Sequence, residues 1–350
     1  TRTWDELYTK KEFNDKNYYV GLFYNNEEAY NSVIGDEEKP KKISISKMKD
    51  FLCVPIKFKV EYLFKVYDSI GNKLDEELEP FLIDNLTKYI ITKHLVKSRF
   101  ENNDFTRIDV REALDILKEY TDSNAIAIIN KDFLTFELRF ISENVSTYLD
   151  QISKMKMTFE MKTLKDYSFC LDNEMITVCA NDNVLLSVNG NIRTYLELMP
   201  FDKTDYQHSI KLYLDSLIDV AALGDDVEYN VELKRGPRTS FNFSITSSKA
   251  NELLKKIYVA MFDNSMNKFF LLKYAKEKDH KLKTYNDLVI SFENDLKYGN
   301  FKYYEDAKLL TSDIIGYTEE NCNEEFDKMI NKINDLVIME KPQRGKKNDK

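Results

Sequence analysis

The middle of the chain alternates between apolar and polar residues in many short runs, which is the period of a β-strand with one buried face. These runs predict strands at 158–163, 167–171, 175–180, 184–188 and 192–199. Asn189-Gly190 separates the last two strands and favours a tight hairpin, because both residues tolerate positive φ. Residues 227–234 and 239–246 predict a further hairpin, joined through Arg235-Gly236-Pro237-Arg238.

Before these strands, the pattern is mixed. Residues 57–67 alternate and predict a strand, whereas 75–97 have the apolar spacing of a helix. We expect 107–119 to run from a strand into a short helix, and 209–217 to do the same. Another hairpin is predicted from 125–129 and 133–141, with Lys131-Asp132 as its turn. Its second strand would alternate through Leu134, Phe136, Leu138 and Phe140.

Helical periodicity follows in two further places. Ser142 is predicted to be the N-cap of a helix through Met155, because its hydroxyl can accept a hydrogen bond from a free backbone amide. Ser248 is predicted to cap another helix, and helical patterns continue to Met339, including 324–338. The basic end, 341–350, is predicted to be a disordered tail.

The amino-acid composition excludes several classes of protein. The 350 residues contain 22 Tyr and 22 Phe and are 43% hydrophobic, so the chain can bury real cores and is not of the disordered class. Its nine glycines argue against folds that bind nucleotides through glycine-rich loops. The length suggests two or three domains. With 51 Lys and Arg against 60 Asp and Glu, the net charge is −9, so a nucleic-acid footprint would have to be local.

Cysteine and histidine offer no metal chemistry. The four cysteines contain no Cys-x-x-Cys pair, and the three histidines lie away from them, so no zinc site is predicted. Cys170 and Cys179 lie in successive predicted strands, and we expect two buried free thiols of a reducing compartment. No stretch of 18 apolar residues occurs, so we expect a soluble intracellular, cytoplasmic protein that does not engage a membrane.

An internal repeat connects the two mixed segments. Residues 108–118 and 210–220 match in apolar spacing, and each is followed by an acidic turn and a predicted hairpin. Phe136-Glu-Leu-Arg-Phe140 matches Phe241-Asn-Phe-Ser-Ile245, and a serine that can open a helix follows each. The unit of strand, short helix, acidic turn, hairpin and helix recurs after about 103 residues in this comparison. The alternative is that two antiparallel α+β domains share the pattern by chance.

This pattern, over residues 105–250, resembles the sliding DNA clamps of the eukaryotic and T4-phage types. The resemblance implies sequence-independent contact between basic helices and the phosphates of duplex DNA. Two segments offer the cations for such contact. The hairpin tip carries Lys234, Arg235 and Arg238, and the helix from 248 carries Lys249, Lys255 and Lys256. The alternative for all six is a merely solvated surface.

A second chemistry is suggested by Glu232-Leu-Lys234, which follows Asp225 and Asp226. It resembles the Glu-x-Lys half of a restriction-type nuclease site, in which carboxylates hold a divalent metal and the lysine steadies the attacking water or leaving phosphate. The alternative is the solvent face of an alternating hairpin strand.

Together these patterns predict an α+β fold with an antiparallel, β-rich central region, clamp-like repeats and a helical C-terminal region. The predicted regions are 1–104 (mixed), 105–247 (clamp-like), 248–340 (helical) and 341–350 (tail). No catalytic residue, metal site or cofactor is predicted. The predicted function is a non-enzymatic, DNA-associated accessory protein of a phage, virus or mobile element, with duplex DNA and a protein partner or homo-oligomer as partners. The alternatives are a structural or protein-interaction component, and a metal-dependent nuclease using Glu232 and Lys234.

Overall fold

The computed structural model describes residues 39–53, 58, 83, 85–120, 131–155, 157–180, 183–198, 206–262, 331 and 335–340. The chain divides into two compact units. One contains Lys42–Ser46, Asp68–Lys255 and Ile338–Lys350, and the other contains Thr1–Lys41, Lys47–Tyr67 and Lys256–Val337. Helices and strands are mixed throughout the described residues, so the predicted α+β class is confirmed.

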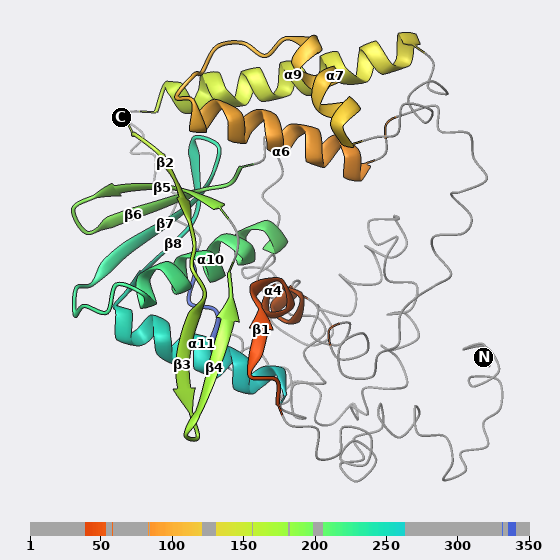
Figure 1. Ribbon diagram of the computed structural model, residues 1–350. Helices are drawn as coiled ribbons and strands as arrows, with labels where there is room; N and C mark the ends of the chain where they lie inside the picture. Colours follow the sequence, from red (N-terminus) through yellow and green to blue (C-terminus); the bar gives the residue numbers. More distant parts are fainter. Residues whose placement is uncertain are drawn as a thin grey trace, which may run out of the picture. The chain divides into compact units, whose positions relative to one another are not determined.

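A five-stranded mixed sheet forms the centre of the first unit (Figure 1). Its strands, in the order β2-β5-β6-β7-β8, are Glu160–Thr163, Asn183–Asn189, Ile192–Leu196, Tyr229–Arg235 and Arg238–Ile245. Neighbouring strands are antiparallel except β6 and β7, which are parallel because a helix connects them. This crossover helix is α10 (Tyr206–Ala221).

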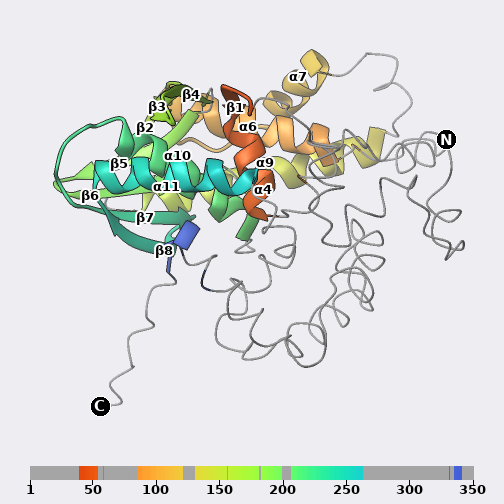
Figure 2. The ribbon, with the colours of Figure 1, turned by 90° about the horizontal axis from the view of Figure 1, so that it is seen from below.

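Alternation along the strands directs side chains to two different helical layers. Leu185 and Leu196, which are opposite each other on β5 and β6, share a core with α6 (Asn85–Glu101), α7 (Val110–Tyr120) and α9 (Lys131–Ser153). Tyr195 and Leu233 point to the other face, where α10 lies against β6, β7 and β8. Seen from below, α10 and α11 (Ser247–Met261) run in front of the sheet (Figure 2).

A smaller sheet, in the order β1-β4-β3, completes this unit. Its strands are β1 (Lys42–Ser44), β3 (Tyr167–Leu171) and β4 (Glu174–Cys179). Asp172 and Asn173 form the turn between β3 and β4 with φ of 50° and 64°, values that Asp and Asn tolerate better than other residues with a Cβ. Helix α4 (Ile45–Cys53) belongs to the other unit from Lys47 onward, where Phe51 is buried edge-on against Phe58, with ring centroids 5.7 Å apart.

The strands predicted between 158 and 246 are confirmed. Most of their ends lie within one or two residues of the predicted ends. The Asn189-Gly190 hairpin is present, but Asn189 pairs with Ile192, so the turn residues are Gly190, at φ 57°, and Asn191. The second hairpin turns at Gly236-Pro237, with Gly236 at φ 65°.

The hairpin predicted at 133–141 is wrong, because these residues belong to α9. Leu134, Leu138 and Ile141 are buried, whereas Phe136 and Phe140 are exposed, which is the period of a helix. Ser142 is therefore not an N-cap but a buried residue in the middle of α9. The partner strand predicted at 125–129 lies outside the described residues.

The two strand-into-helix predictions are confirmed in their helices, α7 and α10, and wrong in their strands, since 107–109 form neither strand nor helix and 209–217 are helical throughout. The predicted repeat fails as a pair of equivalent units, because its first hairpin partner is α9 whereas the second is strand β8. The resemblance to sliding clamps stays a prediction.

The helix predicted at 75–97 corresponds to α6, although 75–82 lie outside the described residues. Of the strand predicted at 57–67 only Phe58 is described, and its backbone is helical. The helix predicted from Ser248 is α11, but its cap is Thr246, whose Oγ1 accepts a hydrogen bond from Lys249 N at 3.3 Å.

Cys170 and Cys179 do not face each other, because Cys170 is opposite Met175 on β4. Both are free, but Cys170 is exposed and Cys179 is half-buried, so the prediction of two buried thiols is wrong.

Candidate functional site

The first three cations predicted to contact DNA lie on the β7–β8 hairpin. Lys234 is only 12% exposed and forms an ion pair with Glu232, 3.3 Å away on the same sheet face. Arg235 is half-buried at the end of β7, and its Nε and one terminal nitrogen are buried without a hydrogen-bond partner. The side chain of Arg238 is outside the description. Two of these three cations are thus substantially covered rather than presented at an open tip.

The other three predicted DNA-contacting cations, Lys249, Lys255 and Lys256, lie on α11. Lys249 is exposed and pairs with Glu252 at 3.1 Å. Lys255 is half-buried and Lys256 is exposed. The six residues are thus distributed over two elements, and their role in binding DNA stays a prediction.

Glu232 and Lys234 are brought together as the nuclease alternative requires, and Thr194 Oγ1 lies 3.4 Å from the Glu232 carboxylate. Asp225 is engaged elsewhere, because it accepts a hydrogen bond from the hydroxyl of Tyr229 at 2.6 Å. Among the described residues, no group of three or more His, Cys, Asp or Glu side chains could hold a metal ion.

A buried ionic cluster, which the sequence analysis did not identify, joins the sheet to α10. Asp219 of α10 is 1% exposed, and its Oδ2 accepts hydrogen bonds of 2.5 Å from both Arg193 and Tyr195 on β6. Lys162 of β2 binds the other carboxylate oxygen. The sequence signal for this cluster is a charged residue among apolar ones, as Asp219 is in Leu217-Ile-Asp-Val-Ala221, because such a residue is seldom buried unless it is paired.

The cluster changes the acidity of its members. Burial raises the pKa of Asp219, but hydrogen bonds from Lys162 and Tyr195 and the Arg193 charge outweigh burial, so this pKa lies below its usual value. Burial, reinforced by the Asp219 charge, raises the pKa of Tyr195 well above its usual value. Asp219 thus stays ionised and Tyr195 stays neutral near pH 7, which suits a structural ion pair.

The same polar network continues to the start of α11. The Arg193 guanidinium lies 5.5 Å from the ring centroid of Tyr229, a cation–π distance. Tyr229 donates to Asp225, and Ser247 Oγ lies 3.2 Å from the same carboxylate and 2.8 Å from the Val220 carbonyl. These contacts fix the turn between α10 and β7 against the first residue of α11.

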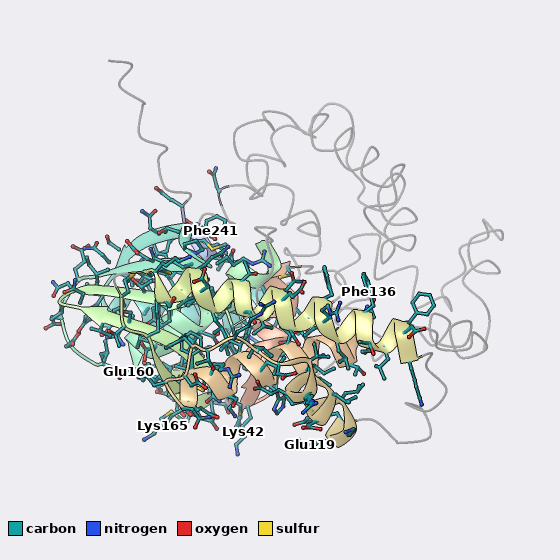
Figure 3. All side chains as sticks on the ribbon, turned by 90° about the horizontal axis from the view of Figure 1, so that it is seen from above. Lys42, Glu119, Phe136, Glu160, Lys165 and Phe241 are labelled. Carbon is teal, nitrogen blue, oxygen red and sulfur yellow. The ribbon has the colours of Figure 1, made fainter. Side chains whose placement is uncertain are left out.

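Within the described residues, an aromatic stripe on α9, formed by Phe133, Phe136 and Phe140, presents three exposed apolar side chains. Their exposed fractions are 51%, 65% and 58%, and the spacing i, i+3, i+7 places them on one face. This face is opposite the buried residues Leu138 and Val145, so the first part of α9 is apolar on two sides. Figure 3 shows Phe136 on the side of α9 away from α6 and α7.

This aromatic stripe was not predicted from the sequence, because Phe136 and Phe140 were assigned to the buried face of a strand. A helical spacing of the three phenylalanines was the available signal.

Comparison with known proteins assigns no family: no family model matches the chain, and no curated protein is significantly similar to it. Within the part of the chain that the structure describes, no helix is long and apolar enough to cross a membrane.

Proposed function

We propose that this protein is a protein-interaction component that binds a partner protein through the aromatic stripe of α9. The observation that carries this proposal is the exposure of three phenylalanines on the helix face opposite the core. Single exposed apolar residues are ordinary, but aromatic residues gathered on one face are typical of interaction sites.

The charges beside the stripe favour a protein over a nucleic acid. Asp132, Arg139 and Glu143 are exposed on one flank of it and contribute one positive charge against two negative ones. A surface that contacts phosphates would gather Lys and Arg instead. A mixed polar rim around apolar residues is the usual composition of a protein interface.

The size of the stripe indicates how strongly it can contribute. A phenylalanine exposes roughly 200 Å² when free, so the three exposed fractions correspond to about 350 Å² of accessible surface. At about 25 cal/mol per Å², burying this surface yields about 9 kcal/mol before the costs of association. Those costs are about 4–15 kcal/mol, so the stripe supports a weak interaction alone and a tighter one with additional contacts.

Site-specific photo-crosslinking tests this proposal. A photoreactive amino acid replaces Phe136 in the full chain, and in a matched control it replaces Met175, which is 60% exposed on β4. In extract of cells that express the protein, we expect a protein adduct at position 136 that is absent at 175. Excess unlabelled chain should change the yield of this adduct, by competing for a different partner or by supplying more of the same chain as partner, whereas an excess of the Phe136→Asp variant should not. Equal adducts at both positions, or equal competition by both chains, would contradict the proposal.

A further inference from the structure

We propose that the partner of the aromatic stripe is a second copy of this chain, with α9 packed antiparallel against α9 of the partner subunit. This inference rests on the proposed function and adds the identity of the partner. The geometry points to a two-fold axis passing beside Phe136, so that both subunits use the same surface.

The order of the phenylalanines fits such an axis. Phe133 lies three residues before Phe136, and Phe140 lies four residues after it. In an antiparallel pair centred there, Phe136 meets Phe136 of the partner subunit, and Phe133 meets the partner's Phe140. With the axis at residue 136, Phe133 is level with the partner's residue 139, one residue short of Phe140. Moving the axis by half a residue, about 0.75 Å along the helix, brings Phe133 level with the partner's Phe140. Edge-to-face contacts between aromatic rings tolerate such a shift.

The charges on one flank give the same arrangement. Asp132 and Arg139 are separated by seven residues, which is close to two helical turns, so both lie on the same side of the stripe. Asp132 lies four residues before Phe136 and Arg139 lies three after it. Antiparallel packing therefore places Asp132 beside the partner's Arg139, and the two-fold axis repeats this pair. Parallel packing would instead bring this flank against the opposite flank of the partner's helix, so Asp132 and Arg139 would not meet across the axis.

The area indicates a concentration-dependent dimer. The stripes of two subunits would bury about 700 Å², less than the roughly 1,200 Å² of a standard specific interface. We therefore expect self-association at about micromolar to millimolar concentration.

Sedimentation equilibrium of the full chain tests this inference over about 10 to 500 µM. The wild-type chain is expected to associate reversibly to dimers. Phe136→Asp places two carboxylates beside the axis and should weaken association by about a hundredfold or more. The control Met175→Asp changes an equally exposed apolar residue on β4 and should leave association unchanged. Circular dichroism and the unfolding midpoint establish that each variant is folded.

Charge reversal tests the antiparallel register itself. Asp132→Arg leaves two cations at the paired positions 132 and 139, and Arg139→Asp leaves two anions at these positions, so each variant alone should associate about tenfold more weakly than wild type. A one-to-one mixture of the two should recover association, because each chain then presents the charges that the other lacks. Failure of the mixture to exceed either variant alone would overturn the arrangement.

The outcomes separate this inference from the proposed function. A wild-type chain that stays monomeric throughout the range overturns the dimer. If the adduct at position 136 then has a mass other than twice the 41.3 kDa chain, the partner is a different protein and the proposed function stands. If position 136 yields no more adduct than 175 and the chain stays monomeric, both proposals fail.

Discussion

Replacing Asp219 with alanine is the most severe single test of the buried ionic cluster. The substitution removes the carboxylate that accepts hydrogen bonds from Arg193, Tyr195 and Lys162. Arg193 is only 7% exposed and keeps its charge, so the variant leaves a cation inside the protein without its counterion.

The magnitude follows from burial. Removing one partner of a buried ion pair typically costs about 3–5 kcal/mol, because the remaining charge loses its partner without regaining water. The bond to Lys162 adds little to this cost, since that side chain is 44% exposed and its charge is screened by solvent. Domains are typically stable by only about 5–15 kcal/mol, so Asp219→Ala should remove a large share of the stability.

Urea unfolding followed by far-UV circular dichroism measures the total change. Hydrogen exchange of peptides from β6 and α10 locates it, because exchange reports the free energy of opening each element. The matched control is Asp150→Ala on α9, where an exposed carboxylate pairs with Lys154 at 2.5 Å. That exposed pair should contribute less than about 1 kcal/mol.

A change for Asp219→Ala within about 1 kcal/mol of the Asp150→Ala control would refute the reasoning. It would mean that water reaches Arg193, or that the sheet and α10 do not need this cluster to stay together.

Three further predictions concern other parts of the chain. The fold lowers the pKa of Asp219, so the Asp219 carboxylate contributes its full stabilisation above the unfolded pKa of about 3.9, and this stabilisation is lost as pH falls below that value. Urea midpoints measured between about pH 5 and 2 should therefore fall less steeply in Asp219→Asn than in wild type. Leu138→Ala should cost about 2–5 kcal/mol of stability, whereas Phe140→Ser should cost little, because only Leu138 is buried; similar urea midpoints for the two would argue against α9 as a helix with one core face. The sequence prediction of DNA binding expects retention on duplex DNA that falls steeply with salt and decreases when Lys249, Lys255 and Lys256 are changed to Ala together; unchanged retention would count against these lysines.

The strands could be predicted from the sequence because their signals are local. Alternation over β3 to β6 indicates where each strand lies, and Gly190 marks the turn between β5 and β6, one residue later than the predicted turn pair. The parallel pairing of β6 and β7 was not predicted, since it depends on a helix over 206–221 that the sequence analysis expected to begin as a strand.

The segment 131–153 shows the opposite case. Leu134, Phe136, Leu138 and Phe140 alternate as in a strand, yet Leu134, Leu138 and Ile141 also fit the face of a helix. Local propensity does not separate these possibilities when every candidate residue is large and apolar. Packing of Leu138 and Val145 in the core with α6 and α7 selects the helix and leaves the phenylalanines outside.

The α+β class and most of the strands follow from local patterns, because short-range alternation and turn chemistry are properties of neighbouring residues. Which cations are covered, which charges meet in the core and which aromatic residues stay exposed depend on the packed fold. Lys234 and Arg193 are both basic residues on strands, but one pairs at the sheet face and the other lies inside against Asp219. Such differences arise from residues distant in sequence, so burial and pairing are fixed only when the helices pack on the sheet.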